Sequence, residues 1–442
     1  MSTSIHKPQK ADHLCVLVHG LWGNPEHLKQ VSDSLRQRFS EDQVEILVAK
    51  RNAGSFTYDG VDTGGERVAS EVEQKLGDLK NDGNEIKKIS VIGYSLGGLV
   101  ARFAIGLLYS RGVFEKIQPV NFTTFATPHL GVRTPLRGYH SHIWNILGAR
   151  TLSMSGRQLF GIDKFRETGR SLLSVLADSN SIFIKGLAQF QHRSLYANVV
   201  NDRTVTYYTA GISQTDPFVK PENVTMNYIS GYDEVILDGD NPVSPKAPEA
   251  PPAFTQRLVS TTSTVIGRVP IVAFLTVFIP IGTTLFLVNS VVQSFRSSHR
   301  IRLHESGQAG VNIQQYRLGN MINAVRREAE DMFENVNNTQ ESDYLSAGST
   351  EVASPTQPTS PGLTRKDTEA AIEKDTLDFP TLALTQDQFG MIEALDTLGF
   401  RKHPVYIHHH RHSHAAIIVR MDKPSFNEGR VVIKHWLDNF QL

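Results

Sequence analysis

The chain has 442 residues with 45 Lys and Arg against 45 Asp and Glu, so its formal net charge is zero. A balanced charge argues against a nucleic-acid-binding protein, which normally carries a strong basic excess. The single cysteine, Cys15, excludes a scaffold held by internal disulfides and favours a reducing compartment. The opening residues, MSTSIHKPQKADH, contain no apolar run, so we expect no signal peptide.

Short apolar runs alternate with amphipathic helical patterns over the first 200 residues. Strands are expected at Leu14–Val18, Val44–Ala49, Ile89–Ile92, Val120–Phe125 and Ser194–Val200. Helices are expected between them at Pro25–Phe39, Gly64–Leu79 and Leu96–Tyr109. Near the end of the chain, a helix at Thr385–Leu398, a strand at Pro404–Ile407 and a helix around Gly429–Phe440 are expected. This alternation predicts an α/β fold, a mostly parallel sheet with helices on both faces.

The predicted core is interrupted by a long insertion. We expect core residues 1–215 with a lid region at 133–190, a linker at 216–264 and an apolar membrane hairpin at 265–296. A charged helical segment at 297–334 and a disordered segment at 335–375 follow, the latter because its Ser, Thr, Pro, Glu and Asn cannot bury enough apolar surface. The core closes over 376–442. The apolar runs at Leu172–Leu176 and Ile182–Phe190 are expected to form the lid and an acyl pocket.

A Gly-x-Ser-x-Gly motif, Gly93-Tyr94-Ser95-Leu96-Gly97, lies between an expected strand and an expected helix. This context is that of a nucleophile elbow, in which a strained turn lifts the serine hydroxyl to the edge of the sheet. Ser95 is therefore the candidate nucleophile. The backbone N–H of Leu96 and that of Leu21, in the loop after the first strand, are the candidate oxyanion donors. We expect His19 only to orient that loop.

The acid and base of such a fold follow the nucleophile in that order along the chain. Asp202 lies just after an expected strand and is the candidate acid, with Asp178 as a weaker alternative because it lies on a helical segment. The residues after the last expected strand include five histidines in seven residues, from His408 to His414. His414 leads directly into small apolar residues and is favoured as the base over His412. A metal site in this histidine run is the less favoured alternative, because no matching Cys, Asp or Glu cluster is nearby.

Several segments together resemble a known family: LCVLVHGLWGNPEHL, TGGERVASEV, ISVIGYSLGGLVARFAIGLLY, FTTFATPHLGV, YANVVNDRTVTYYTA and HSHAAIIVR. Over residues 13–215 and 400–440 the chain is similar to the fungal putative serine esterase family of α/β hydrolases, and within it to a lipid-droplet phospholipase branch. The resemblance implies a Ser–Asp–His hydrolase acting on lipid esters without a cofactor or a bound metal. It gives the nucleophile, acid and base roles to Ser95, Asp202 and His414.

The 27 residues between Arg268 and Arg296 carry no charge, a length in the range of a membrane segment. Ser95 and Asp202 precede this stretch and His414 follows it, so a simple span would separate the triad. The stretch, 269–295, is therefore predicted to enter and leave a lipid surface on one side, as two arms around Pro280-Ile281-Gly282, with a helix pair buried in the fold as the less favoured alternative. Arg268, Arg296, Arg300 and Arg302 would then lie among headgroups.

The sequence thus predicts a hydrolase of phospholipid or acylglycerol esters on the cytosolic face of a lipid droplet or the endoplasmic reticulum. A protein depalmitoylase or thioesterase with the same triad is one alternative. A membrane-anchored tether whose hydrolase fold no longer turns over is another.

Overall fold

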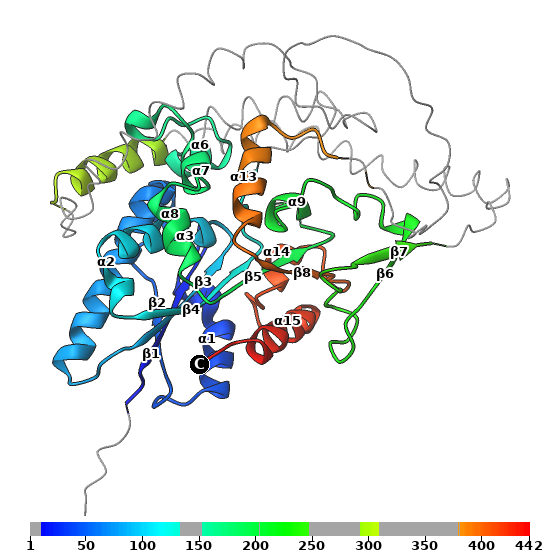
Figure 1. Ribbon diagram of the computed structural model, residues 1–442, viewed down its shortest axis with the longest axis horizontal. Coiled ribbons are helices and arrows are strands. Elements are labelled where there is room, and N and C mark those ends of the chain that lie inside the picture. The colour runs from blue at the N-terminus through cyan, green and yellow to red at the C-terminus, as the bar shows by residue number, and fades with distance from the viewer. Residues whose placement is uncertain (1–9, 133–152, 203, 247–291, 309–378, 380) are drawn as a thin grey trace, which may run out of the picture.

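The computed structural model describes residues 10–132, 153–202, 204–246, 292–308, 379 and 381–442 (Figure 1). The predicted hairpin up to residue 291, residues 133–152 of the predicted lid, and the segment expected to be disordered at 335–375 lie outside these ranges. No helix among the described residues is both long enough and apolar enough to cross a membrane.

A parallel six-stranded sheet forms the centre of the molecule, in the order β2-β1-β3-β4-β5-β8. Its strands are β1 (His13–Val18), β2 (Val44–Val48), β3 (Lys88–Tyr94), β4 (Gln118–Phe125), β5 (His192–Asn198) and β8 (Arg401–Val405). Every strand expected from the sequence is present, shifted by a few residues at its ends. The last one begins earlier than expected, because the polar residues at its start lie on an edge of the sheet.

The strands are buried on both faces, which explains their continuous apolar runs. In β1, Leu14, Val16 and Val18 pack into the core on one side of the sheet, whereas Cys15 and Leu17 pack into the core on the other. The helices α2 (Val61–Asn81), α3 (Leu96–Ser110) and α8 (Ile182–Ala188) cover the first side (Figure 1). The helices α1 (Lys29–Arg38) and α15 (Asn427–Asp438) cover the second. The chain is an α/β protein with the predicted layers.

Further helices lie among the described residues. They are α6 (Met154–Leu159), α7 (Leu172–Leu176), α9 (Tyr207–Ala210), α13 (Gln386–Asp396) and α14 (Ser413–Ala416). The helix α13 begins where the sequence predicts, because the Thr385 hydroxyl accepts a hydrogen bond from the Gln388 N–H in a capping box.

Three segments differ from the expectation. The apolar run Ile182–Phe190 is core rather than lid, since the Phe183 ring lies 4.8 Å from that of Phe103 on α3. Residues 216–246, expected to be linker, are folded. They form the two-stranded sheet of β6 (Val224–Met226) and β7 (Val243–Pro245), and Ile236 pairs with Val405 of β8.

The third difference is a helix at 292–305, which begins inside the stretch predicted to form the hairpin. It packs against the start of α2 instead of standing apart from the core. Arg300, expected among lipid headgroups, instead binds the buried carboxylate of Asp59.

Candidate active site

The turn at Ser95 connects β3 to α3 and holds the backbone in a strained conformation. Ser95 has φ 54° and ψ −130°, a region that a residue other than glycine rarely occupies. Its N–H donates to the Phe125 carbonyl at 2.9 Å, which ties the turn to the end of β4. The hydroxyl therefore lies at the carboxyl edge of the sheet and at the N-terminus of α3, where a developing negative charge is favoured.

His414 joins the two other candidate residues. Its Nε2 lies 2.9 Å from the Ser95 hydroxyl oxygen, and its Nδ1 lies 2.8 Å from Oδ2 of Asp202. An ionised carboxylate only accepts hydrogen bonds, so this network assigns the ring proton to Nδ1 and leaves Nε2 to accept from the serine. The structure thus brings together residues 95, 202 and 414 in the order that general-base activation of a serine requires.

Asp202 lies in the loop after β5 and is almost completely buried. Burial by itself raises the pKa of this carboxyl, but the charge and hydrogen bond of His414, together with hydrogen bonds from Val205 N–H and Asn198, bring its pKa below the ordinary value. The Val205 and Thr204 N–H groups donate to Oδ1 at 2.8 and 3.0 Å. The carboxylate is therefore ionised and fixed in one orientation at neutral pH.

The position of His414 is fixed by its neighbours. The Ser413 hydroxyl donates to the Val200 carbonyl at 2.8 Å, which holds the short helix α14 against the loop after β5. The Tyr94 hydroxyl donates to the His414 carbonyl at 2.9 Å, and the two rings lie 5.2 Å apart. Sequence reasoning missed this role of Tyr94, although the residue occupies the variable position before Ser95 in the motif.

The other histidines of the run have different partners. His408 and His409 bind Glu428 through side-chain and backbone groups, and the His412 N–H donates to the His410 ring. His412 directly precedes α14 and is not the histidine at the serine. The histidine bonded to the Ser95 hydroxyl is His414. Across the described ranges no group of three or more potential ligands is arranged to hold a metal ion.

The loop after β1 packs directly against the serine turn. A Cβ on Gly97 would lie 2.2 Å from the Val18 carbonyl oxygen, and one on Gly20 would lie 2.7 Å from Cβ of Ser95. Only glycine permits this approach at either position. Within the described part of the chain, neither the Leu21 nor the Leu96 N–H donates a hydrogen bond to another protein group. Both amides are therefore available to a negatively charged oxygen formed next to Ser95.

The side chains of His19 and Asp178, both considered from the sequence, are not hydrogen-bonded to Ser95, Asp202 or His414 in the described part of the chain. His19 is buried, and its Nδ1 lies 3.1 Å from the Gly20 carbonyl oxygen, as a residue that orients the loop would. Burial lowers the pKa of His19. Asp178 pairs with Arg170 at 2.6 Å.

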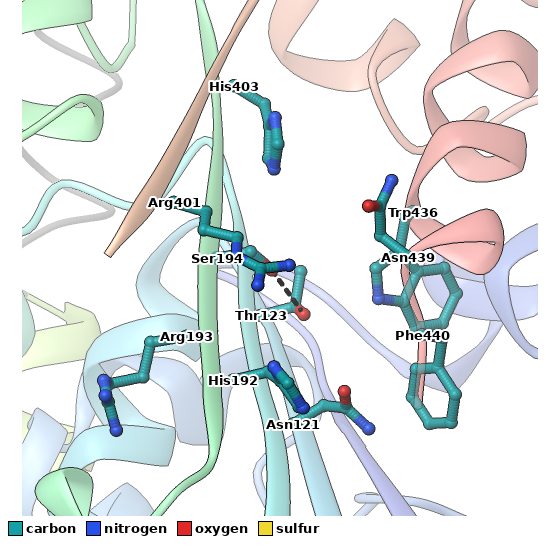
Figure 2. A pocket seen from close by; sticks show the side chains of 10 residues that line it. All are labelled: Asn121, Thr123, His192, Arg193, Ser194, Arg401, His403, Trp436, Asn439 and Phe440. Carbon is teal, nitrogen blue, oxygen red and sulfur yellow. Dashed lines mark hydrogen bonds between the residues drawn. The ribbon is translucent and has the colours of Figure 1, made fainter. Parts of the chain in front are cut away.

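Two hollows in the described residues lie near the sheet without including Ser95. A crevice of about 10 Å³, the space of about one water molecule, lies at the amino ends of β5 and β8 (Figure 2). Its walls include Ser194 and Thr123, whose hydroxyls are 3.0 Å apart, and the ring of His403. A larger hollow of about 300 Å³ opens beside Asp202 and contains Asp216, whose pKa is raised to about 6 by burial.

Comparison with known proteins finds relatives of the first half of the chain. The model of the family described as "Putative serine esterase (DUF676)" matches residues 8–215. "Putative lipase ROG1" of Saccharomyces cerevisiae is 35% identical over 217 residues, covering 48% of this chain and 30% of that protein. "Putative lipase YDL109C" of the same yeast is 29% identical over 251 residues, covering 52% of this chain and 37% of that protein. The chain spans about a third of the length of these relatives.

The comparison with solved structures found two bacterial proteins. A lipase-esterase related protein from Clostridium acetobutylicum has a TM-score of 0.25 and 11% identity, covering 46% of this chain and 80% of that one. A cell surface hydrolase from Lactobacillus plantarum has a TM-score of 0.26 and 10% identity, covering 46% and 75%. Scores this low carry no argument about activity.

Proposed function

We propose that the chain is a serine esterase of the family DUF676, whose model matches residues 8–215, and that it hydrolyses lipid esters with Ser95, His414 and Asp202 as its catalytic triad. The observation that carries the proposal is the continuous hydrogen-bond relay from the Ser95 hydroxyl through the His414 ring to Asp202. A buried acid held by two backbone N–H groups and a strained serine are the features that this chemistry requires.

In the proposed reaction, Ser95 Oγ attacks the carbonyl carbon of the ester while His414 Nε2 takes its proton. The negative charge on the carbonyl oxygen is stabilised by the Leu21 and Leu96 N–H groups. The leaving alcohol then takes the proton from His414, and an acyl group remains on Ser95. Water, deprotonated by His414, cleaves this acyl-enzyme and releases the fatty acid. Asp202 stabilises the charged imidazole throughout.

The proposed substrate is a glycerophospholipid or an acylglycerol at the surface of a lipid droplet or the endoplasmic reticulum. The uncharged residues 269–295 support this, since a stretch of that length and apolarity fits lipid. The contacts of Ser297 and Arg300 with Asp59 give further support, because they return the chain to the catalytic domain directly after the stretch. Entry and exit on one side of the lipid keep His414 beside Ser95.

Fatty-acid release from phosphatidylcholine vesicles and triacylglycerol emulsions tests the proposal. Wild-type protein is expected to act on at least one, and Ser95→Ala to lose at least four orders of magnitude in rate, since the nucleophile is gone. A palmitoyl-cysteine peptide in the same assay separates lipid esterase from thioesterase activity. More than about a tenth of the activity remaining in Ser95→Ala would rule out the serine mechanism.

A further inference from the structure

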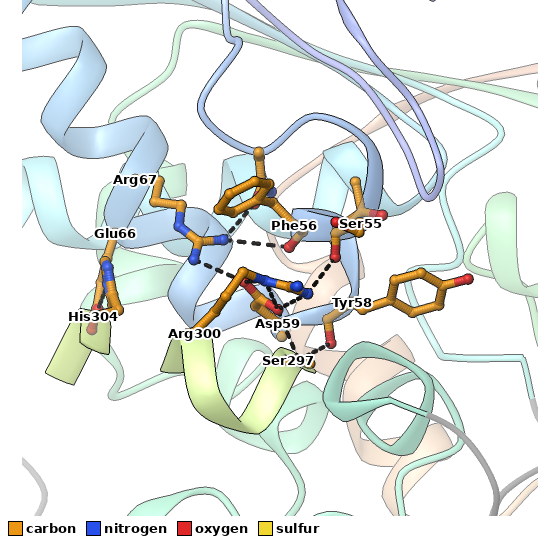
Figure 3. A network of polar contacts seen from close by, with 12 residues as sticks. Ser55, Phe56, Tyr58, Asp59, Glu66, Arg67, Ser297, Arg300 and His304 are labelled. Carbon is orange, nitrogen blue, oxygen red and sulfur yellow. Dashed lines mark hydrogen bonds and ion pairs between the residues drawn. The ribbon is translucent and has the colours of Figure 1, made fainter. Parts of the chain in front are cut away.

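Asp59 is a completely buried carboxylate that receives hydrogen bonds from two distant parts of the chain (Figure 3). Arg67 on α2 donates to its Oδ2 at 2.8 Å. Arg300 on helix 292–305 donates from Nη2 to Oδ1 at 2.7 Å, and the Ser297 hydroxyl donates to the same oxygen at 2.7 Å. One carboxylate thus joins the core of the hydrolase to a helix of the insertion.

Helix 292–305 is held at two further points. The Arg300 guanidinium also donates to the Ser55 carbonyl at 2.8 Å and lies over the ring of Phe56. One turn further on, the buried ring of His304 lies 2.9 Å from Oε2 of Glu66. The helix is therefore fixed along the segment from residue 55 to the first turns of α2 (Figure 3).

The segment that Arg300 holds is bonded in turn to the loop of the candidate oxyanion donor. The Trp22 N–H donates to the Thr57 hydroxyl at 3.0 Å, and the Gly54 N–H donates to the Gly23 carbonyl at 2.7 Å. Trp22 directly follows Leu21 and has φ 55°, an unfavourable value for a residue other than glycine. Such a conformation persists only where neighbouring contacts impose it, and the contacts here come from residues 54 and 57.

We propose that Arg300 is a positioning residue for catalysis, which acts through Asp59 and the segment 54–59 to hold the Leu21 N–H at the oxyanion site. The insertion would then complete the active site. This inference rests on the proposed function for the reaction itself. The contacts that carry it are independent of the triad.

The network permits this role to be separated from folding. When Arg300 is removed, Asp59 keeps its ion pair with Arg67, so no buried charge loses its last partner. The consequence expected is a loosened segment 54–59 in a folded protein. Arg302, on the same helix, is exposed, and its side chain contacts the Ser298 carbonyl, so Arg302→Ala is the matched control.

The test measures kcat and KM of the full chain on the soluble ester p-nitrophenyl butyrate. Arg300→Ala is expected to lower kcat about tenfold with KM changed less than twofold, since an oxyanion donor acts on the transition state. Arg302→Ala is expected to match wild type. Arg300→Lys is expected to recover only part of the rate, because an ammonium cannot reproduce the forked contacts with Asp59 and Ser55.

Thr57→Val is the second test variant, because it removes the hydroxyl that accepts the hydrogen bond from the Trp22 N–H. If Arg300 acts through this segment, the losses in kcat from Arg300→Ala and Thr57→Val are less than multiplicative in the double variant. Multiplicative losses, or an Arg300→Ala variant whose active-site-titrated kcat equals wild type, would overturn the proposal.

A readout without catalysis separates the two proposals. Amide hydrogen exchange over residues 19–24 is expected to accelerate in Arg300→Ala and Ser297→Ala but not in Arg302→Ala. If Ser95→Ala keeps full activity while this pattern holds, the triad is wrong and the coupling stands. If exchange over 19–24 is unchanged in both variants, the coupling is wrong whatever the triad does.

Discussion

Two buried aspartates hold distant parts of this chain together, and their partners differ in kind. Asp202 binds the imidazole of His414, a ring whose second nitrogen faces the Ser95 hydroxyl. Asp59 binds the guanidinium groups of Arg67 and Arg300, which present several N–H donors in a fixed plane. Both carboxylates lie in the interior, and both connect residues more than 200 positions apart.

The difference shows how one kind of side chain serves two purposes. The His414 ring bound by Asp202 also faces the Ser95 hydroxyl, so it can take the serine proton. The ion pairs of Asp59 lead to no reacting group. They hold the two arginines in place and transfer no proton. Variants at the first aspartate are therefore expected chiefly to change rate, and variants at the second to change stability and, through segment 54–59, the rate to a smaller extent.

The largest effect is expected at the base. His414→Ala should lower kcat by about five to six orders of magnitude, as loss of the nucleophile does, because the triad acts as one unit. His412→Ala should stay within about threefold of wild type, since the His412 contacts lie within the histidine run. Steady-state kinetics on a soluble ester decides between them, and an inactive His412→Ala with an active His414→Ala would reverse the assignment.

Asp202→Asn comes next, with a fall in kcat of about four orders of magnitude and a small change in Tm. The amide cannot stabilise the charged imidazole and favours the wrong ring tautomer. The His409→Ala variant, altered in the same region, serves as the control. A loss below about tenfold would mean that another acid orients His414.

Asp59→Ala is expected to lower the free energy of unfolding by about 3–5 kcal/mol, since it leaves two arginines facing a buried space without a counter-charge. Arg300→Ala should cost about 1 kcal/mol, because Asp59 retains Arg67. Urea denaturation of both variants measures the two values. Equal losses would show that the two ion pairs contribute as a single unit.

An effect of similar size concerns acid stability. Burial, with the neighbouring His435, lowers the pKa of His403 to about 3. An imidazole that stays neutral in the folded state binds a proton only on unfolding, so stability falls as pH drops below about 6.5. His403→Phe keeps the stacking on Tyr196 and cannot be protonated. Its free energy of unfolding should therefore fall about 1 to 2 kcal/mol less than that of wild type between pH 6.5 and 5.

Asp202 acts in a lower pH window. Its folded pKa lies below the ordinary value, so its contribution to stability is present above that ordinary value and is lost as pH falls through the folded one. The loss of stability below pH 3.8 should therefore be smaller in Asp202→Asn than in wild type. An equal acid loss in both proteins would mean that the folded state does not lower the pKa of Asp202.

The sequence predicts the parts of the site whose signals are local. A strand, a glycine-flanked serine and a helix follow one another within about 20 residues. The turn at Ser95 can therefore be recognised from the sequence without knowledge of any tertiary contact. Asp202 and His414 were found by their positions after strands, and the structure brings them to Ser95.

The parts that escaped prediction depend on contacts between segments distant in the chain. Arg300 follows an uncharged stretch, and nothing near it in the sequence indicates that its partner is Asp59. Residues 216–246 lack a clear period, yet Val235, Ile236 and Leu237 are buried because they pack beside β8. Periodicity reports which face of an element is buried but not which distant segment covers it.

Labelling with a fluorophosphonate, followed by peptide mass mapping, tests the triad most directly. The reagent phosphonylates a serine only when a base and an oxyanion site activate it. We expect one adduct, on the peptide containing Ser95, absent in Ser95→Ala and slowed by at least a thousandfold in His414→Ala. An adduct on another residue, or labelling at Ser95 that proceeds at the wild-type rate without His414, would contradict the assignment.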